Sequence, residues 1–117
     1  MTDKKILKDI VKALDSKKAQ EIKVIGIRDL TIIADYFVIA SGTSSTQVKA
    51  LADETEFILS KKDITPTRVE GYRGADWIVL DYGSIVVHVF HSKTREFYSL
   101  ERLWADGEQI DIAEFLD

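Results

Sequence analysis

The chain has no cysteine, a single proline and only two histidines among its 117 residues. The absence of cysteine excludes disulfide bonds, thiolate metal sites and cysteine nucleophiles, and it is typical of proteins in a reducing compartment. No apolar run approaches the roughly 20 residues that a membrane-spanning helix needs. The amino-terminal segment alternates charged and apolar residues, unlike the continuous apolar stretch of a signal peptide. We therefore expect a cytoplasmic protein that does not enter a membrane.

Basic charge is also in short supply, because 16 Lys and Arg stand against 20 Asp and Glu, for a net charge of −4. Tight nucleic-acid binding without sequence preference normally needs a clustered basic surface, since affinity comes from neutralising phosphates. We therefore expect no direct nucleic-acid specificity. A basic protein remains a suitable partner, because an acidic surface accelerates its encounter. Residues 106–117 hold five acids and no base, and we interpret this segment as a solvated acidic tail.

Hydrophobic residues make up 45% of the chain, which is enough for one core, so we expect a single domain spanning residues 1–117. Apolar residues at helical spacing predict a helix over 3–17. A second helix should begin at Ser44, which has capping-box spacing to Gln47, and end near Lys62. A third helical segment, "SKTREFYSLERLW", should be broken near Ser99. Strands are predicted at 22–27, at 36–41, within 67–74, and as a hairpin over 76–90.

This order of elements predicts an α/β fold of the layered α+β kind. It combines a mixed five-stranded sheet with helices mainly on one face. The hairpin "DWIVLDYGSIVVHVF" carries the most information about that sheet. If Gly83 and Ser84 form its two-residue loop, glycine stands first, as a type II′ turn prefers. Alternation then places one apolar set of side chains toward the helices. The opposite side, which we call the outer face of the hairpin, carries Trp77, Val79, Asp81, Val86, His88 and Phe90.

The outer face of the hairpin fits neither a core nor an ordinary solvated surface. A buried aspartate without a partner costs several kcal/mol, whereas a solvated face would hold Lys, Glu and Thr. Aromatic anchors with a few polar groups are what protein interfaces favour at their centres. We therefore predict a partner-binding surface. The alternative is that the last helix or the acidic tail folds over this face.

Catalytic signals are weak throughout the sequence. The turn "SGTSS" is similar to the glycine-serine turn of nucleotidyltransferases, but the metal-binding carboxylate pair of those enzymes is missing, and no phosphate-loop lysine follows the turn. His88 and His91 lie on opposite sides of one strand and cannot share a metal. Ser84, Asp81 and His88 are close in sequence, but that proximity alone sets no triad geometry. The sequence thus predicts no catalytic residue, metal or cofactor.

Three basic residues lie near the ends of the predicted hairpin. We expect Arg73, Lys93 and Arg95 to form ordinary surface ion pairs with Glu70 and Glu96, and the alternative is that they bind phosphate.

Three segments together resemble the ribosomal silencing factor family, also called RsfS or Iojap-related: "DYFVIASGTSSTQVKALAD", "EGYRGADWIVLDYGSIVVHVF" and "REFYSLERLW". The similarity runs from about Ile6 to Trp104. The resemblance implies a nucleotidyltransferase-like fold without transferase activity. It also implies a translational repressor that binds the large ribosomal subunit through its protein fourteen and sterically blocks joining of the small subunit under nutrient limitation. A homodimer in the free state is implied as well, and organellar relatives imply a role in large-subunit assembly as the alternative.

The family's hairpin motif has a tryptophan, an aspartate before a glycine turn, and Val-His-Val. This sequence matches the motif with Trp77, Asp81, Gly83 and residues 87–89. The resemblance thus places the partner surface where strand alternation had already placed one, with Trp77 as apolar anchor and Asp81 as charged contact. Ser84 stands where an acid is common in the family. Four further family positions are matched by Phe90, Arg95, Tyr98 and Trp104.

Overall fold

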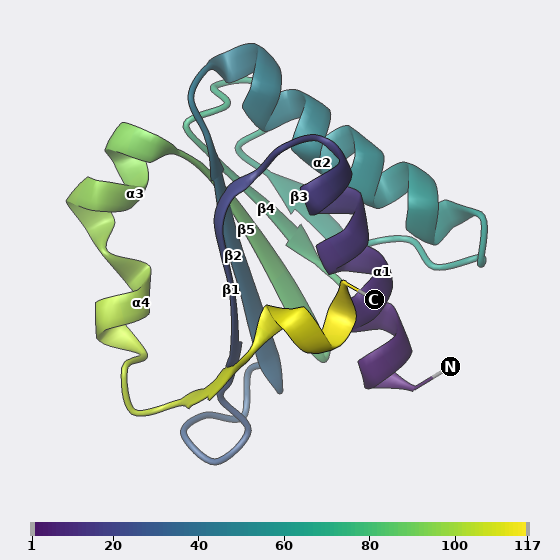
Figure 1. The fold of residues 1–117 in the computed structure, drawn as a ribbon, viewed down its shortest axis with the longest axis vertical. Coiled ribbons are helices and arrows are strands. Elements are labelled where there is room, and N and C mark those ends of the chain that lie inside the picture. Colours follow the sequence, from purple (N-terminus) through teal and green to yellow (C-terminus); the bar gives the residue numbers. More distant parts are fainter. Residues whose placement is uncertain (1, 117) are drawn as a thin grey trace.

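The computed structural model describes residues 2–116, which form a six-stranded sheet between two layers of helix (Figure 1). The helices are α1 (Asp3–Ser16), α2 (Ser45–Ser60), α3 (Ser92–Tyr98), α4 (Leu100–Leu103) and a short 3₁₀ helix, η1 (Ile112–Phe115). The strands are β1 (Gln20–Gly26), β2 (Tyr36–Gly42), β3 (Arg68–Glu70), β4 (Trp77–Asp81), β5 (Ile85–His91) and β6 (Glu108–Ile110).

The sheet is mixed, as predicted, with the strand order β3-β4-β5-β2-β1-β6. Only β2 and β5 pair in parallel, and the other neighbours are antiparallel. The prediction of five strands was wrong, because the acidic tail supplies β6, which pairs with β1 and sets Ile110 opposite Val24. Within β6, Ile110 packs partly buried against the main core, whereas Glu108 and Gln109 are exposed.

Helices α1 and α2 cover one face of the sheet and bury the main core against it. This core includes Leu7, Leu14 and Leu51 from the helices together with Val38 and Val87 from the central strands. Both α1 and α2 begin at a residue whose hydroxyl caps the helix. Thr2 Oγ1 accepts a hydrogen bond from the Lys5 amide at 3.3 Å, and Ser44 Oγ accepts one from the Gln47 amide at 3.1 Å. The start predicted at Ser44 is therefore confirmed.

Helices α3 and α4 lie on the opposite face of the sheet, as Figure 1 shows. Leu100 packs there against Phe37, Ile39 and Phe90, and Trp104 covers the edge of this second cluster. Helices α1 and α2 share one face, as expected, whereas α3 and α4 depart from that expectation and lie on the other. The break predicted near Ser99 is confirmed, since Ser99 adopts a left-handed conformation with φ of 48° between the two helices.

The carboxy-terminal segment runs along the far edge of the sheet from the hairpin. After β6, η1 packs beside α1, and Phe115 is 3% exposed within the main core. It is therefore α3 and α4, and not the acidic tail, that fold over part of the hairpin. Asp117, the last residue of the predicted tail, lies outside the described residues. Across residues 2–116, every helix is too short or too polar to span a bilayer.

Candidate protein-binding site

The hairpin has the register that the sequence predicts. Trp77 pairs with Phe90, Val79 with His88, and Asp81 with Val86. The turn is closed by a hydrogen bond from the Tyr82 amide to the Ile85 carbonyl at 2.9 Å, and Gly83 has a φ of +87°. A positive φ at the first loop residue alone is the mark of a type II′ turn. The six predicted residues therefore do share one face of the sheet.

Helices α3 and α4 divide the outer face of the hairpin into a covered end and an open end. At the covered end Phe90 is fully buried and His88 is 6% exposed, so these two side chains cannot contact a partner directly. The prediction that both side chains contact the partner is corrected here. Strand alternation determines the face on which a side chain lies, but not what covers that face. Trp77 is half-buried at the boundary between the two ends.

Trp77 is held by aromatic contacts on two sides. Its ring stacks on Phe90 with centroids 4.8 Å apart and an interplanar angle of 26°, and Tyr98 of α3 lies 5.1 Å away. The indole Nε1–H donates a hydrogen bond to His88 Nδ1 at 3.1 Å. The indole is thus fixed in orientation by both packing and a polar contact.

His88 is a neutral structural residue. Burial lowers the pKa of its imidazole from 6.5 to about 4, and the nearby Asp81 carboxylate opposes this shift only in part. A neutral ring can accept the Trp77 hydrogen bond at Nδ1, whereas a charged imidazolium cannot. The ring also meets Phe37 edge-on with centroids 4.6 Å apart. His88 therefore supports Trp77 from below.

The open end of the hairpin presents half-exposed Val79, Asp81 and Val86. Asp81 already has two intramolecular roles there. Its Oδ1 accepts a hydrogen bond from the Gly83 amide at 2.8 Å, and its Oδ2 lies 3.8 Å from Arg68 Nη2 on β3. Its side chain still keeps 27% of its surface exposed, and Arg68 is largely in solvent. The carboxylate therefore remains available to an approaching cation.

A groove of about 490 Å³ adjoins Trp77, between α3 and the loop before β4. Phe97 and Tyr98 form its aromatic wall and are 75% and 57% exposed, while Asp76 and Lys93 place charges on its rim. From the sequence, Tyr98 was matched only to a family position outside the predicted partner surface, and Phe97 was given no role. Two adjacent aromatics in a short helix cannot both face the core, and that local signal would have predicted a surface here.

The residues considered for catalysis are not brought together. Ser84 Oγ donates to Asp3 Oδ1 at 3.1 Å, while His88 bonds Trp77 and Asp81 holds the turn. The "SGTSS" turn works as a helix cap. Ser44 Oγ and Gln47 Oε1 already occupy the amides of Gln47 and Thr43, the latter at 2.8 Å. Among the residues from 2 to 116, no group of three or more acids and histidines could hold a metal ion.

Arg95 departs from its predicted place at the surface. It is 4% exposed and bonds Glu101, with 3.1 Å between Nε and Oε2, instead of Glu96 or Glu70. Glu70 lies 3.6 Å from Arg68. No local signal predicts the Arg95–Glu101 pair, because it forms across the break at Ser99.

Comparison with known proteins agrees with the resemblance seen in the sequence. A family model described as "Ribosomal silencing factor during starvation" matches residues 1–117. A Halalkalibacterium halodurans protein named Ribosomal silencing factor RsfS is 38% identical over 112 residues, which cover 96% of this chain and 96% of that protein.

Two further matches extend the comparison. The crystal structure of a Chromobacterium violaceum protein superimposes with a TM-score of 0.88 at 31% identity, covering 95% of this chain and 92% of that one. A mouse protein named Mitochondrial assembly of ribosomal large subunit protein 1 is 35% identical over 98 residues, which are 81% of this chain and 43% of the mouse protein. Because the family model spans residues 1–117 and the H. halodurans relative aligns along nearly its full length, this chain belongs to the ribosomal silencing factor family.

Proposed function

We propose that this protein silences ribosomes by binding protein fourteen of the large subunit and sterically preventing the small subunit from joining. Translation would thereby be repressed when nutrients are limiting. The observation that supports this most is the half-exposed Trp77, held in one orientation by Phe90, Tyr98 and His88 at the edge of an open surface. An indole fixed before binding loses little conformational entropy when it is buried by a partner.

The proposed contact surface has three parts. Trp77 supplies the central aromatic anchor, Val79 and Val86 extend the apolar area, and Asp81 supplies a negative charge for a basic ribosomal protein. Interfaces commonly concentrate their binding energy in such a central aromatic residue surrounded by weaker contacts. His88 and Phe90 take part as the support beneath the indole.

The remaining expectations belong to the same proposal. We propose a single functional domain over residues 1–117, a homodimer in the free state, action in the cytoplasm, and a fold of the nucleotidyltransferase-like kind without transferase activity. The Thr43 and Gln47 amides at the "SGTSS" turn are engaged in helix capping, which favours a binding role over nucleotide handling.

A role in large-subunit assembly is the second candidate. It is favoured by the name of the mouse relative, which refers to assembly of the mitochondrial large subunit. The two roles differ in the particle that is bound. A silencing factor binds mature large subunits, whereas an assembly factor prefers immature ones.

The deciding experiment is sedimentation of the purified protein with separated ribosomal subunits. We expect co-migration with mature large subunits, and fewer joined ribosomes once small subunits are added. Co-migration with immature particles alone would favour the assembly role. A protein that stays at the top of the gradient with both kinds of particle would refute ribosome binding.

A further inference from the structure

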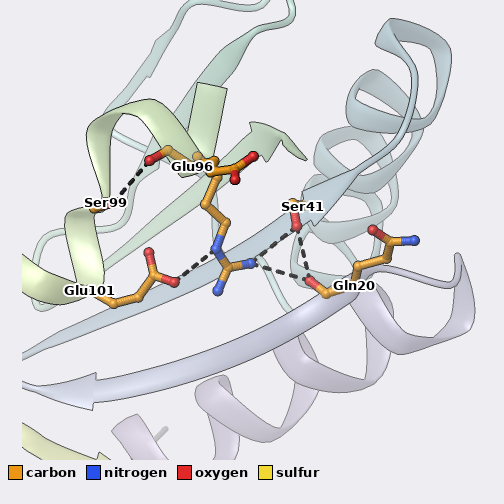
Figure 2. A network of polar contacts seen from close by, with 6 residues as sticks. Gln20, Ser41, Glu96, Ser99 and Glu101 are labelled. Atoms are coloured by element: carbon orange, nitrogen blue, oxygen red, sulfur yellow. Dashed lines mark hydrogen bonds and ion pairs between the residues drawn. The ribbon is translucent and has the colours of Figure 1, made fainter. Parts of the chain in front are cut away.

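Arg95 forms the centre of a polar network between α3, α4 and the sheet (Figure 2). Its Nε donates to Glu101 Oε2 at 3.1 Å. Its Nη1 donates to Ser41 Oγ at 3.1 Å and to the Gln20 carbonyl at 3.3 Å. One guanidinium thereby ties α3 to α4 on one side and to β1 and β2 on the other.

The burial of Arg95 raises the free-energy cost of keeping its charge in this network. A guanidinium that is only 4% exposed has lost most of its hydration, so its contacts must replace the lost water. Arg95 Nη2 and Glu101 Oε1 find no hydrogen-bond partner among the described residues, and both atoms are shielded from solvent. A hollow lined in part by Ser41, Ser99 and Arg102 borders the network, but the burial of these two atoms keeps them from any ligand in it.

The break at Ser99 brings Glu101 back to Arg95. Ser99 takes the left-handed conformation, with φ of 48°, that a residue other than glycine adopts at a cost. Its amide donates to the Arg95 carbonyl at 2.8 Å, and its hydroxyl donates to the Glu96 carbonyl at 3.0 Å (Figure 2). The Arg95–Glu101 pair closes this corner and so helps to hold the strained turn.

The position of α3 matters because Tyr98 forms one wall around Trp77. Tyr98 ends the same short helix that Arg95 attaches to the sheet, and its ring lies 5.1 Å from the indole. Apolar anchors hold α4, through Leu100 and Trp104, but α3 is seven residues long with its two aromatics largely in solvent. Arg95 is the residue of α3 that is buried.

We propose that Arg95 is a positioning residue for the partner surface: its contacts with Glu101, Ser41 and the Gln20 carbonyl hold α3 so that Tyr98 stays against Trp77. This inference rests on the proposed function for its effect on ribosome binding. Its structural part, the placement of Tyr98 beside the indole, stands independently. Lysine cannot replace Arg95, because a single ammonium lacks the planar fork that reaches both α4 and the sheet.

The test uses the full chain with Trp104→Phe, which leaves Trp77 as the sole tryptophan. In that background we expect Arg95→Lys to shift the emission of Trp77 to longer wavelength and to weaken binding to large subunits by at least about tenfold. Arg102→Lys is the matched control, because Arg102 is exposed on α4 and outside the network. It should leave both readouts unchanged. If Arg95→Lys does not fold, Ser41→Ala takes its place with the same direction of change, because it removes one contact of Arg95, together with the bond from Ser41 Oγ to the Gln20 carbonyl at 3.3 Å, and leaves the Glu101 pair in place.

A double-mutant cycle separates positioning from general stability. In a Tyr98→Ala background, Arg95→Lys should change the affinity by less than about twofold, since the wall that Arg95 positions is gone. An undiminished loss of affinity in that background would overturn the proposal, as would unchanged Trp77 emission in Arg95→Lys. If the parent protein does not bind large subunits, the proposed function fails, while the emission of Trp77 still decides whether Arg95 places Tyr98.

Discussion

At the scale of single residues, the hydrogen bond from Trp77 to His88 links the fold of the hairpin to its surface. The indole is buried enough to be oriented by Phe90 and Tyr98, yet it keeps an exposed edge. Its one polar group is satisfied internally by His88 Nδ1 at 3.1 Å. A partner can therefore cover the ring without having to supply an acceptor for the indole N–H.

Replacing Trp77 by alanine should weaken binding to large subunits by at least about 2 kcal/mol, which is the usual scale for a buried aromatic anchor. The dissociation constant of a fluorescently labelled protein, measured by titration with purified subunits, checks this. Phe57→Ala is the control, because Phe57 is 55% exposed on α2, on the other side of the sheet. A folded Trp77→Ala variant with parental affinity would remove Trp77 from the interface.

His88 predicts a pH dependence of stability. Its pKa of about 4 in the folded state lies below the ordinary 6.5, so on acidification the unfolded chain takes up the proton first. Stability from this residue is therefore complete above pH 6.5 and falls as the pH drops toward 4. At pH 5 the loss should be about 2 kcal/mol.

The measurement compares urea unfolding at pH 7.5 and pH 5 for the parent and for His88→Phe. Phenylalanine keeps a ring beside Phe37 but does not titrate, so the pH-dependent loss should shrink by the same about 2 kcal/mol. An equal loss in both proteins would mean that groups other than His88 cause the acid sensitivity.

At the scale of elements, three glycines around β4 differ in what the backbone requires of them. Gly83 has a φ of +87° in open space, and Gly71 has a φ of +79° where a Cβ would lie 2.0 Å from the Trp77 carbonyl oxygen. Gly74 has neither a positive φ nor any atom within 4 Å of such a Cβ. These three glycines therefore form a matched series for substitution by alanine.

Alanine at these positions should give graded losses of unfolding free energy. Gly74→Ala should be within about 0.5 kcal/mol of the parent, and Gly83→Ala should lose about 1–2 kcal/mol through backbone strain. Gly71→Ala should lose more, and it alone should also weaken ribosome binding, because the clash displaces Trp77. Thermal unfolding and the subunit titration check the order. Equal losses at Gly74 and Gly83 would contradict the turn assignment.

The elements that the sequence predicted well are those determined by local signals. The hydroxyl cap at Ser44, the glycine turn of the hairpin and the helix break near Ser99 all depend on neighbouring residues. Strand β6 and the Arg95 network were missed because both depend on contacts between distant segments, with β1 and β2 as the receiving partners. The acidic charge of residues 106–117 led to the prediction of a solvated tail, although this segment contains strand β6.

At the scale of the whole molecule, the same distinction limits what could be predicted of the candidate site. Strand alternation alone placed six residues on one face correctly. It could not say that α3 and α4 cover the half carrying His88 and Phe90, because helix placement is set by Leu100 and Trp104 packing on distant Phe37. The surface left open therefore continues from the hairpin onto α3, beyond the six residues that strand alternation predicted.

The net charge of −4 predicts how the whole molecule approaches a basic partner. Association with such a partner should be faster at low salt and should slow as ionic strength rises. Asp81→Asn keeps an oxygen for the Gly83 amide but removes a half-exposed charge, so stability should change little while the salt dependence of the association rate becomes shallower. Stopped-flow mixing with large subunits at several salt concentrations measures the association rate.

The control is Glu114→Gln, on η1 at the far edge of the sheet. It removes the same net charge and should affect the slope of rate against salt less. Equal slopes for the two variants would mean that overall charge, and not the hairpin surface, guides the encounter.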